Sequence, residues 1–402
     1  EISPEGGNFK RGFFPVFFCF LDKRAVCRVN LKKKQKRSDM DFRYFVPVEI
    51  YGGEDCVRKN AAVFARCGSR ALIVTGKSSA KNGSLADVAA VLEANGQEYA
   101  VFDSVPPNPT VQSVEEGAAL ARRFGAGFIV AVGGGSPMDA AKAIAVLARQ
   151  LAPEGIFAHK IGADVLPMLH IPTTAGTGSE VTPYAIITND EKQTKTSISA
   201  PSLFPKAAFL DGKYMKGLPQ SVTVNTALDA VSHAVEGMLS VRAGALSDAL
   251  ARESLRLLLG EYPSLLKGEY TALSRQNLLN GAALAGMVIA NTGTSPVHGM
   301  GYSLTYFHGV AHGRANGLLL PAFLAVCERK IPARMSEICA ALGMSVREFT
   351  DRVAALLGGR ESLTDAERRD YAARAAKNKN VANCLAKFSE ADLYEVLCAS
   401  FH

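Results

Sequence analysis

Residues 127–139 read GFIVAVGGGSPMD, and this stretch decides the class of fold. Its first six residues are almost entirely apolar, which is typical of a strand that a parallel sheet buries on both faces. Three glycines and a serine follow as a turn, and Pro137 suits the first turn of a helix, which we expect to reach Leu147. The stretch therefore predicts a strand, a turn and a helix in immediate succession.

The same alternation extends to both sides of this unit. Short apolar runs predict strands, and longer runs with helical periodicity predict helices between them. The expected strands are residues 44–50, 71–75, 99–102, 168–171, 184–188 and 207–210, and the expected helices are 85–95 and 111–124. Such a series predicts an α/β domain with a parallel sheet over residues 40–213.

After Asp211 the periodicity is helical only. The expected helices are residues 224–239, 246–258, 273–289, 317–328, 332–342, 346–357, 365–376 and 390–401. We therefore expect an all-helical domain over residues 214–402, with the active site in the cleft between the two domains.

The first 39 residues differ from the rest. They hold ten Lys or Arg and four Asp or Glu, which accounts for +6 of the net charge of +7. Met40 begins a segment typical of an enzyme start, so we expect residues 1–39 to be an appended leader outside the fold. The apolar run 13–21 and the basic run 32–37 leave a targeting role as the alternative.

The remaining composition excludes several classes of function. Beyond residue 39 the net charge is only +1, which is no nucleic-acid signature. The eight cysteines are scattered without a C-x-x-C pair, which predicts reduced thiols and a cytoplasmic protein. No apolar run approaches the roughly eighteen residues that a membrane span needs.

Two turns at strand ends suit a nucleotide. The glycines of residues 133–139 let the backbone approach a phosphate at a helix N-terminus, and the turn 172–180 (PTTAGTGSE) offers small hydroxyl groups. Either turn alone could be an ordinary tight turn or surface loop, but the pair favours a nucleotide. The candidate contacts are Gly134, Gly135, Ser136, Asp139, Thr173, Thr174 and Thr177.

The second half holds a histidine-rich window. Residues 291–317 contain three of the seven histidines, His298, His308 and His312, and upstream Asp229 and His233 lie four residues apart. On a helix, that spacing places both side chains on one face. A carboxylate with two or three imidazoles suits a divalent metal, whereas polar caps of helix ends are the alternative.

Four motifs together resemble the iron-containing, or group III, alcohol dehydrogenases. They are GGGSPMDAAK (residues 133–142), IPTTAGTGSEVT (171–182), TALDAVSHAVEGMLS (226–240) and VHGMGYSLTYFHGVAHGRANGLLLP (297–321). The resemblance runs from about Met40 to the C-terminus. It implies the architecture shared with dehydroquinate synthases, in which an α/β nucleotide-binding domain precedes an all-α metal-binding domain.

The resemblance also implies cofactors and their residues. The metal would be Fe(II), with Zn(II) left open, and its ligands would be Asp229, His233, His298 and His312. The turn 133–139 (the glycine turn) and the turn 172–180 (the threonine turn) would hold a nicotinamide dinucleotide, with Asn108 and Lys195 nearby. The implied reaction is reversible hydride transfer between a primary alcohol or diol and the nicotinamide, with the metal as a Lewis acid.

The chain departs from many members at two places. Where they carry an Asp that favours NAD, this chain has Gly76, followed by the candidate 2′-phosphate contacts Lys77, Ser78 and Ser79, which predicts NADP(H) with NAD left open. Where they carry a histidine assigned to proton transfer, it has Tyr302. Either His308 takes that role or the proton leaves through the cofactor ribose and water.

Rival functions and partners follow from the same resemblance. The rivals are a glycerol-dehydrogenase-like polyol oxidoreductase that uses NAD, a sugar-acid cyclase, and a non-catalytic metal- or nucleotide-binding relative. Because the four-ligand pattern argues against the cyclase, we expect a dehydrogenase. Its expected partner is a small-molecule alcohol or aldehyde, with a homodimer left open and with neither a nucleic acid nor a membrane.

Overall fold

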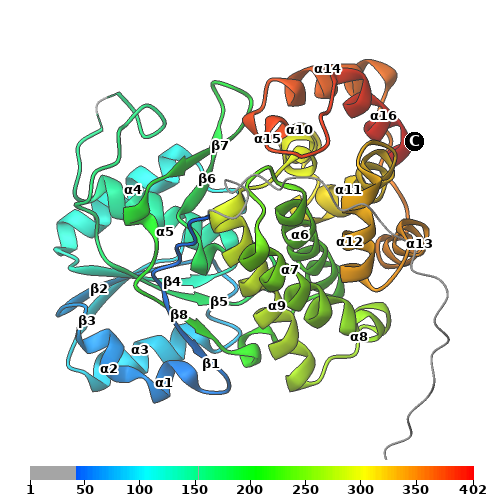
Figure 1. Ribbon diagram of the computed structural model, residues 1–402. Coiled ribbons are helices and arrows are strands. Elements are labelled where there is room, and N and C mark those ends of the chain that lie inside the picture. The colour runs from blue at the N-terminus through cyan, green and yellow to red at the C-terminus, as the bar shows by residue number, and fades with distance from the viewer. Residues whose placement is uncertain (1–41, 153) are drawn as a thin grey trace, which may run out of the picture. The chain divides into compact units, whose positions relative to one another are not determined.

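The strand predicted from residues 127–132 lies inside a six-stranded sheet in the computed structural model, which describes residues 42–152 and 154–402 (Figure 1). Every pairing in this sheet is parallel, in the order β1-β8-β5-β4-β2-β3. The strands are β1 (Glu49–Gly52), β2 (Arg70–Thr75), β3 (Glu98–Phe102), β4 (Phe128–Gly133), β5 (Met168–Pro172) and β8 (Ala207–Leu210). The expectations for residues 1–39 concern residues that are not described.

Helices cover both faces of this sheet, as Figure 1 shows. One face packs on α1 (Cys56–Lys59), α2 (Ala61–Ala65) and α3 (Ser84–Ala94), and the other on α4 (Val111–Phe124) and α5 (Gly135–Leu147). Successive side chains of a strand point to opposite faces, so in β2 Leu72 packs toward α5 and Ile73 toward α3. Both faces of β2 and β4 are therefore apolar, as the sequence predicted.

Of a second, two-stranded sheet, the sequence predicted only the first strand. β6 (Tyr184–Asn189) pairs antiparallel with β7 (Thr194–Ser199), which the sequence did not predict and which carries Lys195. Only Ile198 of β7 is buried, so the strand lacks the apolar signal of a core strand. The short 3₁₀ helices η2 (Ser179–Val181), η3 (Pro201–Leu203) and η4 (Gly212–Met215) complete this domain.

The first predicted strand is shorter than expected. Residues 44–48 are not part of β1, because Pro47 has no N–H to donate to a strand ladder. This segment packs on the helical domain instead: the Tyr44 hydroxyl donates to the Met287 carbonyl at 2.9 Å, and the Phe45 N–H donates to Asn291 Oδ1 at 2.8 Å.

The helical domain contains all eight predicted helices. Its elements are α6 (Gln220–Leu239), α7 (Ala245–Gly260), α8 (Tyr262–Lys267), α9 (Ala272–Thr292), α10 (Pro296–His308), α11 (His312–Lys330), α12 (Pro332–Leu342), α13 (Val346–Leu357), α14 (Asp365–Ala376), α15 (Lys379–Ala382) and α16 (Glu390–Ser400). Residues 42–402 form one compact unit, so the boundary expected at residue 213 stays a prediction.

Periodicity did not reveal α10, α8 or α15. In α10 the reason is Gly299 and Gly301, which resemble loop residues in the sequence. At Gly301 an added Cβ would lie 2.5 Å from Asn316 Oδ1 of α11. Close packing of α10 against α11 therefore requires a glycine at this position, although glycine lowers helix propensity.

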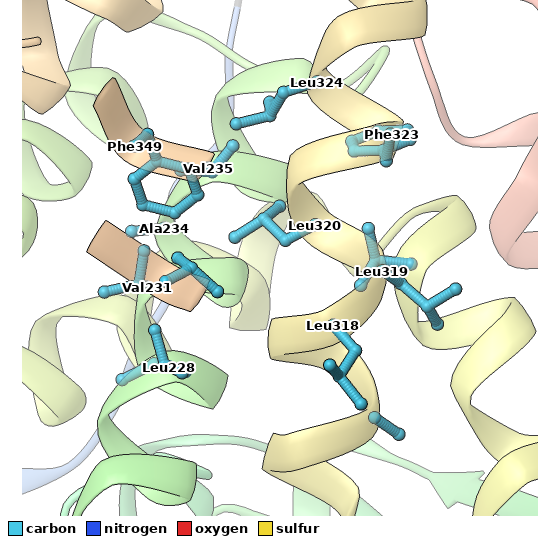
Figure 2. Packing of buried hydrophobic residues seen from close by; sticks show 14 of the residues in the cluster. Leu228, Val231, Ala234, Val235, Leu318, Leu319, Leu320, Phe323, Leu324 and Phe349 are labelled. Atoms are coloured by element: carbon cyan, nitrogen blue, oxygen red, sulfur yellow. The ribbon is translucent and has the colours of Figure 1, made fainter. Parts of the chain in front are cut away.

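The core of the helical domain surrounds α6. Figure 2 shows Leu228, Val231 and Val235 of α6 facing the α11 side chains Leu320 and Leu324. Burying each such side chain contributes about 1.5–3 kcal/mol. Because α6 is buried on nearly all sides, its polar residues also lie in the interior, and these include Asp229, His233 and Glu236.

The two domains meet in an unusually close backbone contact. An added Cβ at Gly178, which precedes η2, would lie 2.5 Å from the Cα of Gly286 in α9. This contact brings the threonine turn against the helical domain.

Two further expectations concern compartment and membrane. Cys56, Cys67, Cys327, Cys339, Cys384 and Cys398 lie in the described part of the chain, and none of them forms a disulfide. None of the helices within residues 42–402 combines the length and the apolar character of a transmembrane span.

Candidate active site

Both domains line one cavity of about 510 Å³. The α/β domain contributes the N-terminus of α5, the threonine turn and β7, and the helical domain contributes α6, α10, the start of α11 and α15. The predicted site residues that line it are Asn108, Gly135, Ser136, Asp139, Thr177, Lys195, Asp229, His233, His298, Tyr302 and His312. The expected cleft is therefore present, with metal candidates and nucleotide candidates facing the same space.

The four metal candidates converge at the helical side of this cavity. One donor atom each from Asp229, His298 and His312 lies within 4.8 Å of the other two. Asp229 Oδ1 is 3.6 Å from His298 Nε2 and 3.7 Å from His312 Nε2. His233 joins through its Nε2, which is 2.9 Å from His298 Nε2.

Helix geometry explains the convergence. Asp229 and His233 share one face of α6, because residues four apart lie above each other on a helix. His298 stands in the first turn of α10, and His312 is the first residue of α11. The link between these two helices, which includes Gly309 at a φ of 64°, lets both helix starts approach α6.

A buried glutamate orients one of these histidines, and the sequence analysis missed it. Glu236, one turn beyond His233 on α6, accepts a hydrogen bond from Nδ1–H of His298. It also accepts from the Ser295 N–H at 2.9 Å and from the Val297 N–H at 3.0 Å, at the N-terminus of α10. With Nδ1 held by Glu236, it is Nε2 of His298 that faces the cluster and would bind a metal. The sequence signal that could have identified Glu236 is its i, i+7 spacing from Asp229, which places both residues on one face of a helix.

Asn316 is a second residue that the sequence analysis missed. It lies four residues after His312 on α11, and its Nδ2 is 2.8 Å from Asp229 Oδ1 and 3.1 Å from His298 Nε2. Its side chain is fully buried beneath Gly301. The spacing from His312 places it on the ligand face of the helix, which is the signal that could have found it.

The electrostatics of the cluster suit a cation. Burial opposes ionisation of Asp229, yet the surrounding histidines hold the pKa of its carboxyl below the usual value. Burial lowers the pKa of His312 to about 3, so this imidazole is neutral and has a lone pair. For His298, burial is outweighed by Glu236 and Asp229, which raise its pKa to about 10, so this imidazole is protonated without a metal, and a bound metal would replace the proton on Nε2. A buried carboxylate with converging imidazole nitrogens fits a divalent metal such as Fe(II) or Zn(II).

The glycine turn and the threonine turn interlock at the other side of the cavity. An added Cβ at Gly135 would lie 2.6 Å from Thr177 Cγ2, and one at Gly134 would lie 3.0 Å from Thr174 Oγ1. No side chain caps the N-terminus of α5. Its first N–H groups are therefore available to a phosphate, which fits a dinucleotide.

Asn108 and Lys195 also line this cavity, and their contact with a dinucleotide stays a prediction. Lys195 Nζ donates to Asn108 Oδ1 at 2.7 Å, and the Asn108 N–H donates to Ser136 Oγ at 3.2 Å. Burial lowers the pKa of Lys195 to about 8, against the opposing charges of Asp139 and Asp229. Asn108 adopts a φ of 59°, a left-handed conformation that asparagine tolerates better than most residues.

Asp139 has a supporting role in this structure. Its carboxylate accepts from Ser179 Oγ at 2.6 Å and from the Ile186 N–H at 3.0 Å. Beneath it, Lys142 Nζ donates to the carbonyls of Ser179 and Tyr184 at 2.7 and 2.6 Å. This buried network joins α5, η2 and β6, and the sequence analysis missed Lys142.

Other predicted cofactor contacts lie outside the cavity lining. Gly134, Thr173 and Thr174 stand behind the lining residues, and Gly76, Lys77 and Ser78 follow β2 near the same sheet edge. Lys77 and Ser78 are exposed. Ser79 differs: it is fully buried, and its hydroxyl donates to the Val132 carbonyl at 3.2 Å, so it is not a phosphate contact in this conformation.

The structure separates the two proton-transfer candidates. Tyr302 lines the cavity, with its ring centroid 6.0 Å from that of His312. His308 is exposed at the end of α10, with its Nε2 2.8 Å from the Tyr371 hydroxyl and 3.3 Å from Glu367 Oε1. It does not line the cavity, so His308 is not placed to act on a substrate there.

Comparisons with known proteins agree with this site. Residues 47–212 match the family model for iron-containing alcohol dehydrogenase, and residues 223–401 match that for the C-terminal part of the Fe-containing alcohol dehydrogenase family.

Individual relatives point the same way. Lactaldehyde reductase of Escherichia coli (strain K12) is 37% identical over 258 residues, which span 63% of this chain and 66% of that enzyme. The 1,3-propanediol dehydrogenase of Klebsiella pneumoniae is 33% identical over 316 residues, 76% of this chain and 80% of that enzyme. The iron-containing alcohol dehydrogenase structure from Thermotoga maritima superimposes with a TM-score of 0.83 at 35% identity, covering 90% of this chain and 99% of that one. The chain therefore belongs to the iron-containing alcohol dehydrogenase family.

Proposed function

We propose that this chain is a metal-dependent alcohol dehydrogenase that reduces small aldehydes with NADPH and oxidises the corresponding primary alcohols or diols with NADP⁺. One observation carries the proposal. The cluster of Asp229 and three histidines faces the same cavity as the N-terminus of α5, whose N–H groups suit a phosphate. Family membership supports an oxidoreductase acting on alcohols.

The roles follow from what each group offers. Asp229, His233, His298 and His312 would hold the metal, and the glycine and threonine turns would hold the dinucleotide. When bound, the metal supplies Lewis acidity at the substrate oxygen and the nicotinamide supplies the hydride. In the reducing direction the carbonyl carbon gains a hydride and its oxygen gains a proton, so one aldehyde, one NADPH and one proton yield one alcohol and one NADP⁺.

We assign the role of proton transfer to Tyr302. It lines the cavity beside His312, at the position where many relatives carry a histidine. Burial raises the pKa of its hydroxyl, so the group stays protonated at neutral pH. It would pass a proton between substrate and solvent as a neutral donor and acceptor, with no phenolate formed.

The preference for NADP(H) rests on the segment after β2. Lys77 and Ser78 are exposed there, and both suit a 2′-phosphate. At Gly76 an added Cβ would be 3.6 Å from the Val105 carbonyl oxygen and 3.9 Å from Pro137 Cγ. This position therefore has space for a side chain. Because it is a glycine, the chain lacks the Asp carboxylate that would repel a 2′-phosphate there.

The test is oxidation of NADPH and of NADH with a panel of short aldehydes, after anaerobic loading with Fe(II) or Zn(II). We expect turnover that requires the metal and a higher kcat/KM with NADPH. His298→Ala and His312→Ala should bind less metal by elemental analysis and lose turnover, whereas His308→Ala should retain its metal. Full turnover in His298→Ala would refute the metal assignment, and equal or better rates with NADH would refute the cofactor preference.

A further inference from the structure

The cavity carries positive charge that no acidic side chain neutralises. Arg242 and Lys379 both line it. Within residues 42–152 and 154–402, neither makes an ion pair. The acidic residues in the lining are Asp139 and Asp229, and both already have partners: Asp139 in the buried network and Asp229 in the histidine cluster. Two lining cations thus remain available to a bound molecule.

Arg242 is held in place by a buried amide. Its Nε donates to Asn383 Oδ1 at 3.3 Å. The Nδ2 of Asn383 donates to the carbonyls of Thr292 and Thr294 at 2.8 and 2.9 Å, so the amide is itself fixed. At Gly293 an added Cβ would lie 3.0 Å from Arg242 Nη2, so the guanidinium lies close against this glycine. The contact uses Nε and leaves the two terminal nitrogens for a ligand.

Lys379 reaches the cavity from a different element. It begins α15 and precedes Asn380, whose Nδ2 donates to Thr294 Oγ1 at 3.0 Å. Asn380, Asn383 and Thr294 line the cavity as well. The aliphatic side chain that the helical domain contributes to the lining is Ile289, and Ile186 of β6 lines the cavity from the α/β domain. Near Arg242 and Lys379 an oxyanion would therefore find a guanidinium, an ammonium and side-chain amides.

We propose that the aldehyde substrate carries an anionic group, a carboxylate, sulfonate or phosphonate, which Arg242 and Lys379 bind while the carbonyl faces the histidine cluster. This inference rests on the proposed function of the same site. The planar guanidinium pairs with two oxygens of such a group, and the ammonium of Lys379 adds a second charge. The substrate class is thus a short aldehyde acid, and the product is the corresponding hydroxy acid.

Cofactor phosphate is the rival occupant of these two cations. The α5 N-terminus already offers free N–H groups to a phosphate from the α/β domain. Arg242 and Lys379 instead belong to the helical domain, and Arg242 adjoins Gly293 and Asn383 there. Their location therefore favours the substrate over the dinucleotide, and the experiment separates the two.

The experiment compares matched aldehydes on the metal-loaded enzyme. Sulfoacetaldehyde, phosphonoacetaldehyde and succinic semialdehyde are each compared with a neutral aldehyde of similar size, propanal or butanal, by NADPH oxidation. Because a hydrogen bond to a charged group contributes about 1.5–3 kcal/mol, we expect kcat/KM for the preferred anion to exceed that of its neutral partner by about tenfold or more. The three anions identify which oxyanion fits.

Variants then locate the effect. Arg242→Gln and Lys379→Gln should each lower the ratio of anionic to neutral kcat/KM by roughly tenfold. The matched control is Lys377→Gln, which removes the same charge two residues from Lys379 at an exposed position outside the cavity lining, and it should leave the ratio unchanged. A rise in KM for NADPH with an unchanged ratio would assign the cations to the cofactor and overturn the proposal.

A binding measurement keeps the inference separate from turnover. Titration calorimetry with 2-hydroxyethanesulfonate, 2-hydroxyethylphosphonate and 4-hydroxybutanoate, against 1-butanol, should show binding of a hydroxy acid that Arg242→Gln weakens. If no aldehyde of either kind is reduced, the proposed function fails, yet calorimetry still decides on the anion site. Equal affinity for 1-butanol and every hydroxy acid, or wild-type rates that favour the neutral aldehydes, would overturn the inference.

Discussion

The carboxylate of Glu236 accepts the Nδ1–H of His298, and thereby links α6 to the first turn of α10. Glu236 is fully buried, and it also accepts hydrogen bonds from the Ser295 hydroxyl and from N–H groups at the same helix N-terminus. It therefore fixes both the orientation of the imidazole and the tautomer that leaves Nε2 free.

Replacing this carboxylate should weaken the metal site before it weakens the fold. We expect Glu236→Gln to lower the affinity for Zn(II) or Co(II) by about 10- to 100-fold, because the amide is a poorer acceptor for the imidazole N–H. Competition with a chromogenic chelator measures the affinity, and the Co(II) absorption spectrum reports the ligand geometry. The exposed Glu253→Gln serves as the control. An unchanged affinity and spectrum would show that Glu236 does not position the ligand.

The segment after β2 yields a test of cofactor choice. Gly76→Asp should shift preference from NADPH toward NADH, because the new carboxylate repels a 2′-phosphate and accepts hydrogen bonds from a 2′-hydroxyl. The surroundings of Gly76 leave room for the side chain. The readout is the ratio of kcat/KM for the two cofactors, expected to change by at least about tenfold. Lys77→Gln should raise KM for NADPH alone, and a parallel change with NADH would point to a general effect on the loop.

Proton transfer distinguishes Tyr302 from His308. We expect Tyr302→Phe to lower kcat for aldehyde reduction by about tenfold or more, in line with the contribution of a positioned proton donor. His308→Gln should leave kcat within about twofold, since that side chain contacts Tyr371 and Glu367 and does not line the cavity. Steady-state rates with a saturating aldehyde measure both. A larger loss of kcat in His308→Gln than in Tyr302→Phe would assign proton transfer to His308.

The sequence predicted the fold where local patterns agree with burial. Apolar runs such as residues 128–132 are buried on both faces of the sheet, so their composition alone identifies them. β7 was missed because its residues are mostly polar and only Ile198 is buried. α10 was missed as a periodic helix because tertiary packing on Asn316 demands Gly301, which local propensity disfavours.

The candidate site divides in the same way. Residue types and the spacing of Asp229 and His233 predicted a metal site, whereas the choice of His298 and His312 over His308 came from the family resemblance. Glu236, Asn316 and Arg242 have ordinary residue types, and their relevance comes from long-range contacts with His298, Asp229 and Asn383. Ser79 was wrongly included because burial, which sequence patterns do not resolve in a polar turn, points its hydroxyl at Val132.

A buried carboxyl beneath the cavity gives a pH-dependent stability. Burial raises the pKa of Glu180 to about 7, despite the charge of Lys142. A folded pKa above the unfolded value means that the folded state holds the proton between pH 4.5 and 7, so stability from this group is lost as pH rises through that window.

Glu180→Gln removes that titration. Relative to the wild type, the variant should gain stability from pH 4.5 to pH 7 by up to roughly 3 kcal/mol, because one pKa unit corresponds to about 1.4 kcal/mol. Urea unfolding of the metal-free proteins at several pH values measures the difference. Glu261→Gln, at the partly exposed residue that follows α7, is the control for the substitution itself. A constant difference across the window would contradict the burial of an ionisable Glu180.

The contact between Gly178 and Gly286 couples stability to the cofactor site. At Gly286 an added Cβ would lie 2.7 Å from Gly178 Cα and 2.8 Å from the Gly178 carbonyl oxygen, and backbone atoms cannot move aside cheaply. Gly286→Ala should therefore destabilise the protein by roughly 2 kcal/mol or more, although alanine favours the helix. Thr177 adjoins Gly178, so the variant should also bind NADPH more weakly.

The matched control is Gly260→Ala at the end of α7, where no atom lies within 4 Å of an added Cβ. There the same substitution should be neutral or stabilise by up to about 1 kcal/mol, since only helix propensity changes. Thermal unfolding and fluorescence titration with NADPH compare the two variants. If Gly286→Ala behaves like Gly260→Ala in both measurements, the helical domain does not hold the threonine turn in place, and the cofactor loop depends on the α/β domain alone.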